Sequence, residues 1–268
     1  MSAMPKRTSP WPTGVPCWVD LTVPDVPAAQ AFYSAVLGWT FAEGAEDFGG
    51  YVIAQVDGAA VAGIGPTTRQ GIPAAWTLYL ATDDADRTAG AVTDAGGTML
   101  LPPGDVGPLG RLFVAADPTG AVFGGWQAGT HIGVELHSEP GGLTWEDLRT
   151  PDPPTAWDFY ARVFGLQTRP LEMAGPDYRT FHLPGDDAPL GGMGAMLGLD
   201  STHIPPHWLP YFGVTGTDAA VAAAVAGGGS KPMEPHDSPF GRMGSVTDPF
   251  GAVFTVVQTD GSSPPPER

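Results

Sequence analysis

The first half of the chain opens with an alternating pattern that predicts a strand leading into a helix. Within residues 18–23, Val19, Leu21 and Val23 alternate with Trp18, Asp20 and Thr22, which is typical of a strand with two different faces. Asp25 can then cap a helix whose first turn accepts Pro27. Apolar residues recur at helical spacing before Gly38, which ends the helix; they are Phe32, Tyr33, Val36 and Leu37.

A second series of the same kind follows in this half. Short strand-like runs are predicted around Thr40, at 51–56 and at 60–65. Residues 76–80 then start a new strand, and a helix is expected from about Asp84 to Ala95, with two glycines at its end. The order strand, helix and three strands therefore occurs twice within about 115 residues.

The chain repeats itself at a period of roughly 130 residues. The run that starts at Trp18, WVDLTVPD, is answered by WEDLRTPD at Trp145, and AFYSAVLG by DFYARVFG. Near the end of each half, DPTGAVF is matched by DPFGAVF. We therefore expect a flexible N-terminus at 1–13, a first domain at 14–128, a linker at 129–140, a second domain at 141–259 and a flexible tail at 260–268.

Composition limits the partners that we expect. Twelve Lys and Arg against 29 Asp and Glu give a net charge of −17, which disfavours nucleic acid and acidic membrane surfaces. Cys17 is the single cysteine of the sequence, so a disulfide within the chain is excluded. No apolar run has membrane-spanning length and no signal-peptide core follows the N-terminus, so we expect a cytoplasmic protein. The duplication makes a monomer sufficient, although a homodimer stays open.

These motifs resemble the vicinal-oxygen-chelate superfamily, which includes glyoxalases, bleomycin resistance proteins and dioxygenases. The resemblance rests on VPDVPAAQAFYSAVLGW, on the helix from Thr82 to the Ala-Gly-Gly at its end, and on the Asp-Pro-Thr-Gly turn, and it covers nearly the whole chain twice. It implies an α+β fold of two tandem domains. Each domain would join two strand-helix-three-strand units into a cup-like mixed sheet, with helices outside and the ligand or metal inside the cup.

The same resemblance implies metal ligands that this sequence lacks. Family enzymes usually carry His or Gln on the first strand, where this chain has Trp18 and Trp145, and Glu on the last strand, where it has Gly124 and Thr255. None of these four is a plausible ligand for a divalent metal. His203 and His207 are close in sequence, but prolines between them argue against one helical face. We therefore expect no metal, no cofactor, and no metal-dependent glyoxalase or dioxygenase activity.

The cups instead contain aromatic and polar residues that suit a flat organic ligand. The candidate ligand-binding residues are Trp18, Asp20, Tyr51, Trp76 and Trp126 in the first half and Trp145, Asp147, Arg149, Tyr178, Trp208 and Phe212 in the second. Two alternatives stay open at this point. The tryptophans at the former metal positions either line a ligand or plug the cup, and the two aspartates either orient a ligand or anchor the backbone.

Three functions are compatible with this sequence. The first is a metal-free protein that sequesters a hydrophobic or aromatic natural product, in resistance to an antibiotic or as an accessory to its biosynthesis. The second is a cofactor-independent enzyme of secondary metabolism, such as a hydroxylase-like protein, cyclase or isomerase, with Asp20, Asp147 or His182 as general base. The third is a protein-interaction module with filled cups. Catalytic residues are not identified by the sequence.

Overall fold

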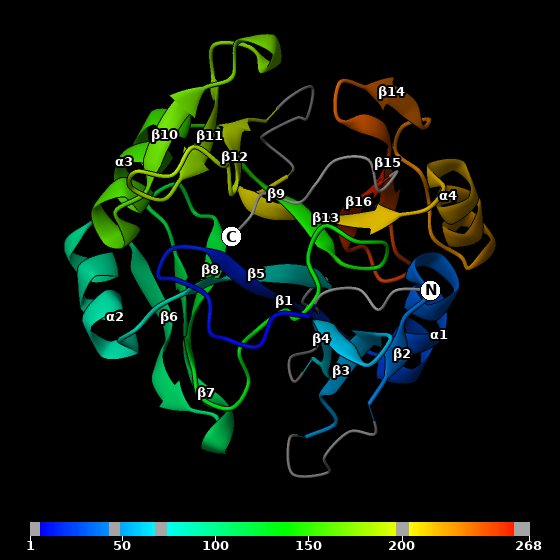
Figure 1. Ribbon diagram of the computed structural model, residues 1–268, viewed down its shortest axis with the longest axis horizontal. Coiled ribbons are helices and arrows are strands. Elements are labelled where there is room, and N and C mark those ends of the chain that lie inside the picture. The colour runs from blue at the N-terminus through cyan, green and yellow to red at the C-terminus, as the bar shows by residue number, and fades with distance from the viewer. Residues whose placement is uncertain (1–5, 43–48, 68–73, 197–203, 260–268) are drawn as a thin grey trace.

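The two halves of the chain form one sheet each. The computed structural model describes residues 6–42, 49–67, 74–196 and 204–259, and within them each half contributes an eight-stranded sheet with two α-helices (Figure 1). Each sheet combines parallel and antiparallel pairs. The predicted α+β fold of two tandem domains, each made of two strand-helix-three-strand units, is confirmed.

In the first half the two units follow one another along the chain. The first unit consists of β1 (Pro16–Val23), α1 (Val26–Leu37), β2 (Thr40–Phe41), β3 (Val52–Val56) and β4 (Ala59–Pro66). The second consists of β5 (Ala75–Ala81), α2 (Ala85–Asp94), β6 (Thr98–Asp105), β7 (Gly110–Ala116) and β8 (Val122–Ala128), with a short 3-10 turn, Gly107–Leu109, before β7.

The second half repeats this order. Its first unit consists of β9 (Leu143–Thr150), α3 (Pro153–Phe164), β10 (Gln167–Pro170), the 3-10 turn Glu172–Ala174, β11 (Tyr178–His182) and β12 (Gly191–Ala195). Its second consists of β13 (His207–Val214), α4 (Thr217–Ala226), β14 (His236–Ser238), β15 (Gly241–Thr247) and β16 (Val253–Gln258).

Local sequence explains where the helices begin and end. The Asp25 carboxylate accepts a hydrogen bond from the Ala28 backbone N–H at 3.0 Å, and Asp152 caps α3 in the same way through Thr155. Gly38 and Gly165 follow the two helices with φ of 71° each, in the left-handed region that a glycine adopts without strain. The repeated Asp and Gly of the sequence therefore set the same helix length in both halves.

Strand order places the first strand of each unit at the centre of its sheet. The first sheet runs β2-β3-β4-β1-β5-β8-β7-β6, and the second has the corresponding order β10-β11-β12-β9-β13-β16-β15-β14. The central strands β1 and β5 are antiparallel, whereas each pairs in parallel with the last strand of its own unit. The positions that correspond to the family's metal ligands therefore lie on β1 and β8 in the first sheet and on β9 and β16 in the second, with one strand between them in each case.

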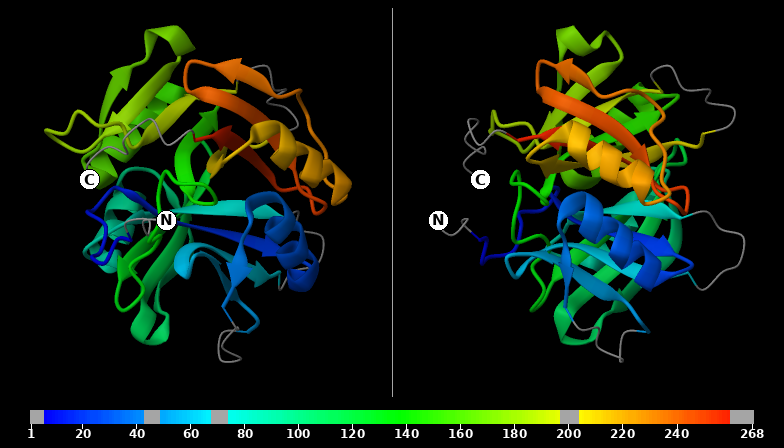
Figure 2. Two further views of the ribbon diagram at one scale, coloured as in Figure 1. Left: turned by 45° about the vertical axis from the view of Figure 1, so that its right-hand side comes forward. Right: turned by 90° about the vertical axis from the view of Figure 1, so that its right-hand side faces the viewer.

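The two halves pack against each other through helices and aromatic side chains. Helix α1 lies beside α4 at one end of the interface, and α2 beside α3 at the other (Figures 1 and 2). Between the sheets, Tyr33 stacks on Trp39 with ring centroids 5.3 Å apart, and Trp39 meets Phe212 edge-on at 5.2 Å. The core is therefore shared by the two domains rather than separate in each.

Two reciprocal hydrogen bonds explain why the Phe-Tyr and Asp-Pro motifs recur together. The hydroxyl of Tyr33 on α1 donates to Asp248 of the other half at 2.9 Å, and Tyr160 on α3 donates to Asp117 at 3.3 Å. Each aspartate uses its other oxygen to close its own turn, as Asp117 does with the backbone N–H groups of residues 119 and 121. One carboxylate thus holds both a local turn and the partner domain.

The segment before β1 differs from the expectation of a flexible N-terminus up to residue 13. The described part of it, from residue 6, lies against the linker: the Arg7 backbone N–H donates to the Glu135 carbonyl, and the indole N–H of buried Trp11 donates to the Val134 carbonyl. A tryptophan that buries its rings and satisfies its N–H explains this packing. Residues 1–5 and the predicted tail at 260–268 lie outside the described residues.

Among the described residues, no helix has the length and apolar character needed to cross a membrane.

Candidate functional site

The floor of each cup is the sheet face that points away from the other domain. On β1 and β5 the register pairs Trp18 with Tyr79 and Asp20 with Thr77, so these side chains share one face. The opposite face carries Leu21 and Trp76, which are paired with each other and enter the shared core. We call the face with Trp18 and Asp20 the first cup, and the matching face with Trp145 and Asp147 the second cup.

Two tyrosines lie over the floor of the first cup. The indole N–H of Trp18 donates to the Tyr51 hydroxyl at 2.9 Å, and the Tyr79 hydroxyl donates to Asp20 at 3.0 Å. Both rings occupy space that only glycine leaves open. A Cβ at Gly63 would lie 1.7 Å from the Tyr51 oxygen, and one at Gly124 would lie 2.1 Å from the Tyr79 ring. The glycines of β4 and β8 are therefore part of this arrangement.

Asp20 has an unusual electrostatic position in the first cup. Burial raises the pKa of Asp20 to about 7, although the hydrogen bond from Tyr79 acts in the opposite direction. No ion pair joins it to a lysine or arginine in the described part of the chain. A carboxyl group with a pKa near neutrality can accept or donate a proton at physiological pH.

Asp147 occupies the corresponding place in the second cup but is fully paired. Its carboxylate is 2% exposed and accepts hydrogen bonds from Tyr178 at 2.6 Å, Tyr211 at 2.7 Å and the indole of Trp145 at 3.0 Å. It also forms an ion pair with Arg149. Tyr178 lies over glycine as Tyr51 does, since a Cβ at Gly192 would be 1.8 Å from its oxygen.

The two cups thus share a set of four side chains and differ in a fifth. A Trp, an Asp and two Tyr residues occupy matching places: Trp18, Asp20, Tyr51 and Tyr79 in the first cup, and Trp145, Asp147, Tyr178 and Tyr211 in the second. The fifth position is Thr22 in the first half and Arg149 in the second, two residues after each aspartate. Only the second cup therefore has a cation at this place.

The linker covers part of the first cup. The ring of His131 meets Trp18 edge-on at 4.4 Å and lies 5.5 Å from the ring of Trp126, whose indole N–H donates to the His131 carbonyl at 2.9 Å. Trp18 and Trp126 are accordingly only 4% and 6% exposed. Trp145, by contrast, is half-buried. No sequence pattern predicts that His131 lies at the first cup, because it belongs to a segment without periodicity.

Three of the sequence-predicted ligand-binding residues lie in the shared core. Trp76 and Phe212 have ring centroids 5.3 Å apart, and Trp208 packs edge-on against Tyr160 at 5.4 Å. All three are buried. The reason is strand alternation: Trp76 and Tyr79 are three positions apart, an odd number, so they point to opposite faces. The cup residues of these strands are instead Tyr79 and Tyr211.

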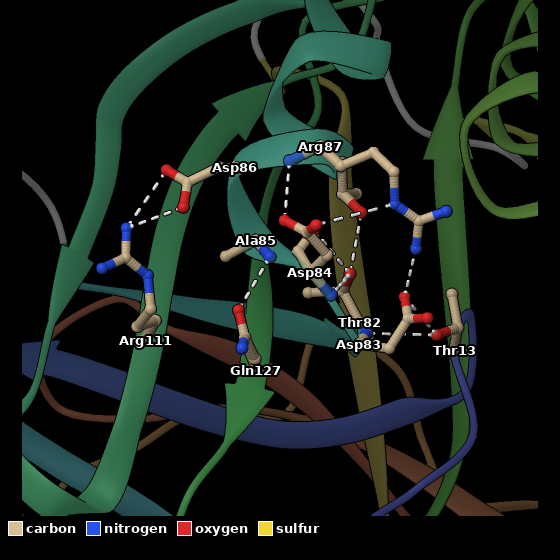
Figure 3. Close-up of polar contacts among 10 residues, drawn as sticks. Thr13, Thr82, Asp83, Asp84, Ala85, Asp86, Arg87, Arg111 and Gln127 are labelled. Atoms are coloured by element: carbon tan, nitrogen blue, oxygen red, sulfur yellow. Dashed lines mark hydrogen bonds and ion pairs between the residues drawn. The ribbon is translucent and has the colours of Figure 1, made fainter.

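Two arginines at matching places in the two halves form ion pairs outside the cup floors. Arg111 pairs with Asp86 at 3.0 Å (Figure 3). It also pairs with Asp105 at 2.6 Å, so it ties the start of α2 to the β6–β7 hairpin. Arg242 repeats this with Asp218 and Asp237. These arginines therefore neutralise surface carboxylates.

Of the histidines named from the sequence, His182 and His207 lie within the described residues, on different strands. His182 is buried on β11, where its Nε2 lies 2.8 Å from the Thr180 hydroxyl oxygen. His207 lies at the start of β13, paired in register with Arg149, and its Nδ1 is 2.9 Å from the Pro205 carbonyl oxygen. His203 lies outside the described residues. Burial lowers the pKa of both His182 and His207.

A cavity of about 260 Å³ lies beside the first cup. Its wall includes Trp11, Cys17 and Trp126, and its polar side is formed by Asp83, which receives a hydrogen bond from Thr13, and by Gln127, which accepts one from the Ala85 backbone N–H (Figure 3). Burial raises the pKa of the Cys17 thiol, so it is held as the unreactive thiol.

The metal of the resembling enzymes does not fit the residues at its usual place. Trp18 and Trp145 stand on the first strands, Gly124 has no side chain and is covered by Tyr79, and Thr255 lies beside Tyr211. Among the described residues, no group of three or more His, Cys, Asp or Glu side chains could hold a metal ion. A divalent ion needs several such ligands at short range, and the side chains at these positions do not supply them.

Comparison with known proteins identifies the family. A model described as the Glyoxalase/Bleomycin resistance protein/Dioxygenase superfamily matches residues 17–124 and 142–256. CFP32 of Mycobacterium tuberculosis, named as a candidate glyoxylase, is 40% identical over 262 residues, which cover 95% of this chain and 98% of that protein. The anthracycline biosynthesis protein DnrV of Streptomyces peucetius is 39% identical over 260 residues, which cover 91% and 93%.

Solved structures show the same fold at lower identity. The Mn(II)-bound glyoxalase from Novosphingobium aromaticivorans has a TM-score of 0.65 at 17% identity, covering 92% of this chain and 83% of that one. The 2,3-dioxygenase LapB from Pseudomonas sp. KL28 has a TM-score of 0.61 at 16% identity, covering 96% of both chains. With the family model matched in both halves, the chain belongs to the glyoxalase, bleomycin resistance protein and dioxygenase superfamily.

Proposed function

We propose that this protein binds a flat aromatic small molecule in its second cup without a metal ion. The observation that carries the proposal is the replacement of the family's metal positions by a hydrogen-bonded Trp-Asp-Tyr-Tyr set, which presents aromatic faces where ligands of the family lie. Trp145 and Tyr211 are only half-buried, so their rings are available for stacking. In the first cup, His131 already covers Trp18, which supports the alternative that Trp18 fills this cup instead of contacting a ligand.

A relative gives the ligand class of the proposal. DnrV is named for anthracycline biosynthesis, and the identity of 39% extends over nearly both whole chains. Anthracyclines are fused planar rings with polar edges, which suits stacking on indole and phenol rings and a few fixed polar groups. We therefore propose a role in holding an aromatic polycyclic product, as an accessory to its biosynthesis or in resistance to it.

Isothermal titration calorimetry with an anthracycline, with and without EDTA, tests this function. We expect binding whose dissociation constant is the same in both conditions, and no metal at stoichiometric amount in the purified protein. Trp145→Leu should weaken binding about tenfold, which corresponds to about 1.4 kcal/mol. Trp157→Leu is the matched control, because Trp157 lies on α3 beneath Arg179 and away from either cup.

Two results would contradict the proposal. A dissociation constant that depends on added Mn(II) or Ni(II) would mean that a metal site exists after all. If no fused-ring probe binds, the result would favour the interpretation that side chains fill both cups. The protein-interaction module would then be the favoured function.

The first cup supports a second candidate function, a cofactor-independent enzyme. Asp20 lies in a partly buried position and has no cationic partner among the described residues, and its pKa of about 7 matches what a general base needs near neutral pH. In this alternative Asp20 would remove a proton next to a carbonyl group of the substrate, as in an isomerase or cyclase. The substrate class is the same polycyclic molecule.

A single substitution separates the two functions. Asp20→Asn keeps an oxygen for the Tyr79 hydrogen bond but cannot take a proton. If the protein is an enzyme of this type, the variant should retain ligand binding by calorimetry and lose turnover of the bound molecule, measured by mass spectrometry of the ligand. Equal conversion by wild type and variant, or conversion by neither, would remove Asp20 as a base.

A further inference from the structure

Arg149 presents its guanidinium to the second cup while its counter-ion is hidden. The side chain of Arg149 is 13% exposed, whereas that of Asp147 is 3% exposed. The guanidinium donates to Asp147 and, at 3.4 Å, to the Ala195 carbonyl, and its carbon lies 5.5 Å from the centroid of the Tyr178 ring. The guanidinium is therefore the more accessible of the two charged groups.

The charge of Asp147 is satisfied from several sides. Besides Arg149 it accepts hydrogen bonds from Tyr178, Tyr211 and Trp145, all of which are neutral donors. Hydrogen bonds to a carboxylate spread and stabilise its charge, so the guanidinium is not its sole partner. A guanidinium has five N–H groups in one plane. Asp147, the Ala195 carbonyl and the neighbouring Tyr211 oxygen occupy part of this set.

The first cup offers the opposite environment at the same place. Thr22, which corresponds to Arg149, is exposed and carries no charge. An acidic ligand there would lie next to Asp20 and would be repelled when that group is ionised. The whole chain has a net charge of −17, so an anion is disfavoured at long range as well. A local cation offsets this unfavourable field for an acidic molecule.

We propose that the second cup selects aromatic ligands that carry an ionised acidic group, which pairs with Arg149 while the rings lie against Trp145. This inference rests on the proposed function and adds the chemical class of the ligand. The charged and titratable groups that surround the guanidinium are Asp147, Tyr178, Tyr211 and His207. None of them supplies a second cation of fixed charge, so the selection depends on Arg149.

Paired probes of equal ring shape test the inference. Anthraquinone-2-carboxylate and the neutral anthraquinone-2-carboxamide are titrated by calorimetry into the whole protein near neutral pH. Wild type should bind the carboxylate at least about tenfold more tightly, since a charge-assisted hydrogen bond contributes about 1.5–3 kcal/mol. Raising the salt concentration should weaken binding of the carboxylate probe, because salt screens the attraction between its charge and the guanidinium. Binding of the neutral carboxamide should be nearly unchanged.

Exchanging the residues that distinguish the cups completes the test. Arg149→Thr gives the second cup the residue of the first and should abolish the preference, with a larger loss for the carboxylate than for the carboxamide. Arg149→Lys should keep part of it. Circular dichroism and the melting temperature of each variant show whether it is folded. Equal binding of the two probes by wild type overturns the inference even where a variant does not fold.

The outcomes distinguish this inference from the function on which it rests. If both probes bind wild type equally, or if Arg149→Thr keeps the preference, Arg149 does not select an acidic group although aromatic binding stands. If neither probe nor an anthracycline binds, the proposed function fails and the inference fails with it.

Discussion

Replacing Asp20 by asparagine should change how stability depends on pH. A carboxyl group with a pKa of about 7 in the folded state and an ordinary value of 3.8 in the unfolded state binds its proton more tightly when the protein is folded. Stability therefore falls as pH rises from about 4 to about 7, because the unfolded state then gains more by releasing the proton. Above about pH 7 this loss of stability is complete, and below about pH 4 there is no loss.

The size of the effect follows from the two pKa values. Each unit of difference between folded and unfolded states corresponds to about 1.4 kcal/mol. Between about pH 5 and about pH 8 this carboxyl should lower the free energy of unfolding by about 2.5 kcal/mol. Asp20→Asn cannot titrate and keeps an acceptor for the Tyr79 hydroxyl. Its stability relative to wild type should therefore increase by about 2.5 kcal/mol over this range.

Urea unfolding followed by tryptophan fluorescence at both pH values measures the difference. The titrations of all other groups cancel when variant and wild type are compared at each pH, provided that the slope of the unfolding curve is unchanged. Asp158→Asn, at an exposed position on α3, controls for the removal of one negative charge from the chain. A difference between Asp20→Asn and wild type that is the same at both pH values would refute the assignment of a raised pKa to Asp20.

Two further predictions concern the contacts that build the fold and the cups. Tyr33→Phe and Tyr160→Phe each remove the hydroxyl that binds a buried aspartate of the other half, so each should lower the free energy of unfolding by about 1–3 kcal/mol; an unchanged urea midpoint in both would mean that these bonds do not join the domains. Gly192→Ala should displace Tyr178, lower stability by about 1–3 kcal/mol and weaken aromatic ligand binding in calorimetry. Gly90→Ala is its control, because it lies exposed on α2 with open space around it and should raise stability by about 0.5–1 kcal/mol in the same urea assay.

Much of the fold was accessible from the sequence because its signals are local. The repeated Asp caps and terminal glycines act within one turn of a helix, so the bounds of α1 and α3 follow from neighbouring residues. The alternation on β1 and β9 likewise placed Trp18 with Asp20, and Trp145 with Asp147, on one face. Duplication strengthened these inferences because each pattern occurs twice.

The candidate site was only partly accessible for two different reasons. Trp76, Trp208 and Phe212 were predicted to bind ligand because they are aromatic, yet strict alternation separates Trp76 from Tyr79 and would have pointed to the tyrosine. His131 is different in kind. Its contact with Trp18 comes from a linker without periodicity, so no pattern in the sequence indicates it.

By itself the sequence determined the duplication, the order of the elements, the loss of the family's metal positions and the presence of an arginine in one half where the other has threonine. Only the tertiary structure decided what these residues do. Tyr178 and Tyr211 reach Asp147 from 31 and 64 positions away, so Arg149 lies beside a carboxylate that has other partners. Among the described residues, Asp20 accepts a hydrogen bond from Tyr79 and has no cationic partner. The physical reason is that caps and alternation act over a few residues, whereas the charge and burial of a side chain depend on every strand that folds beside it.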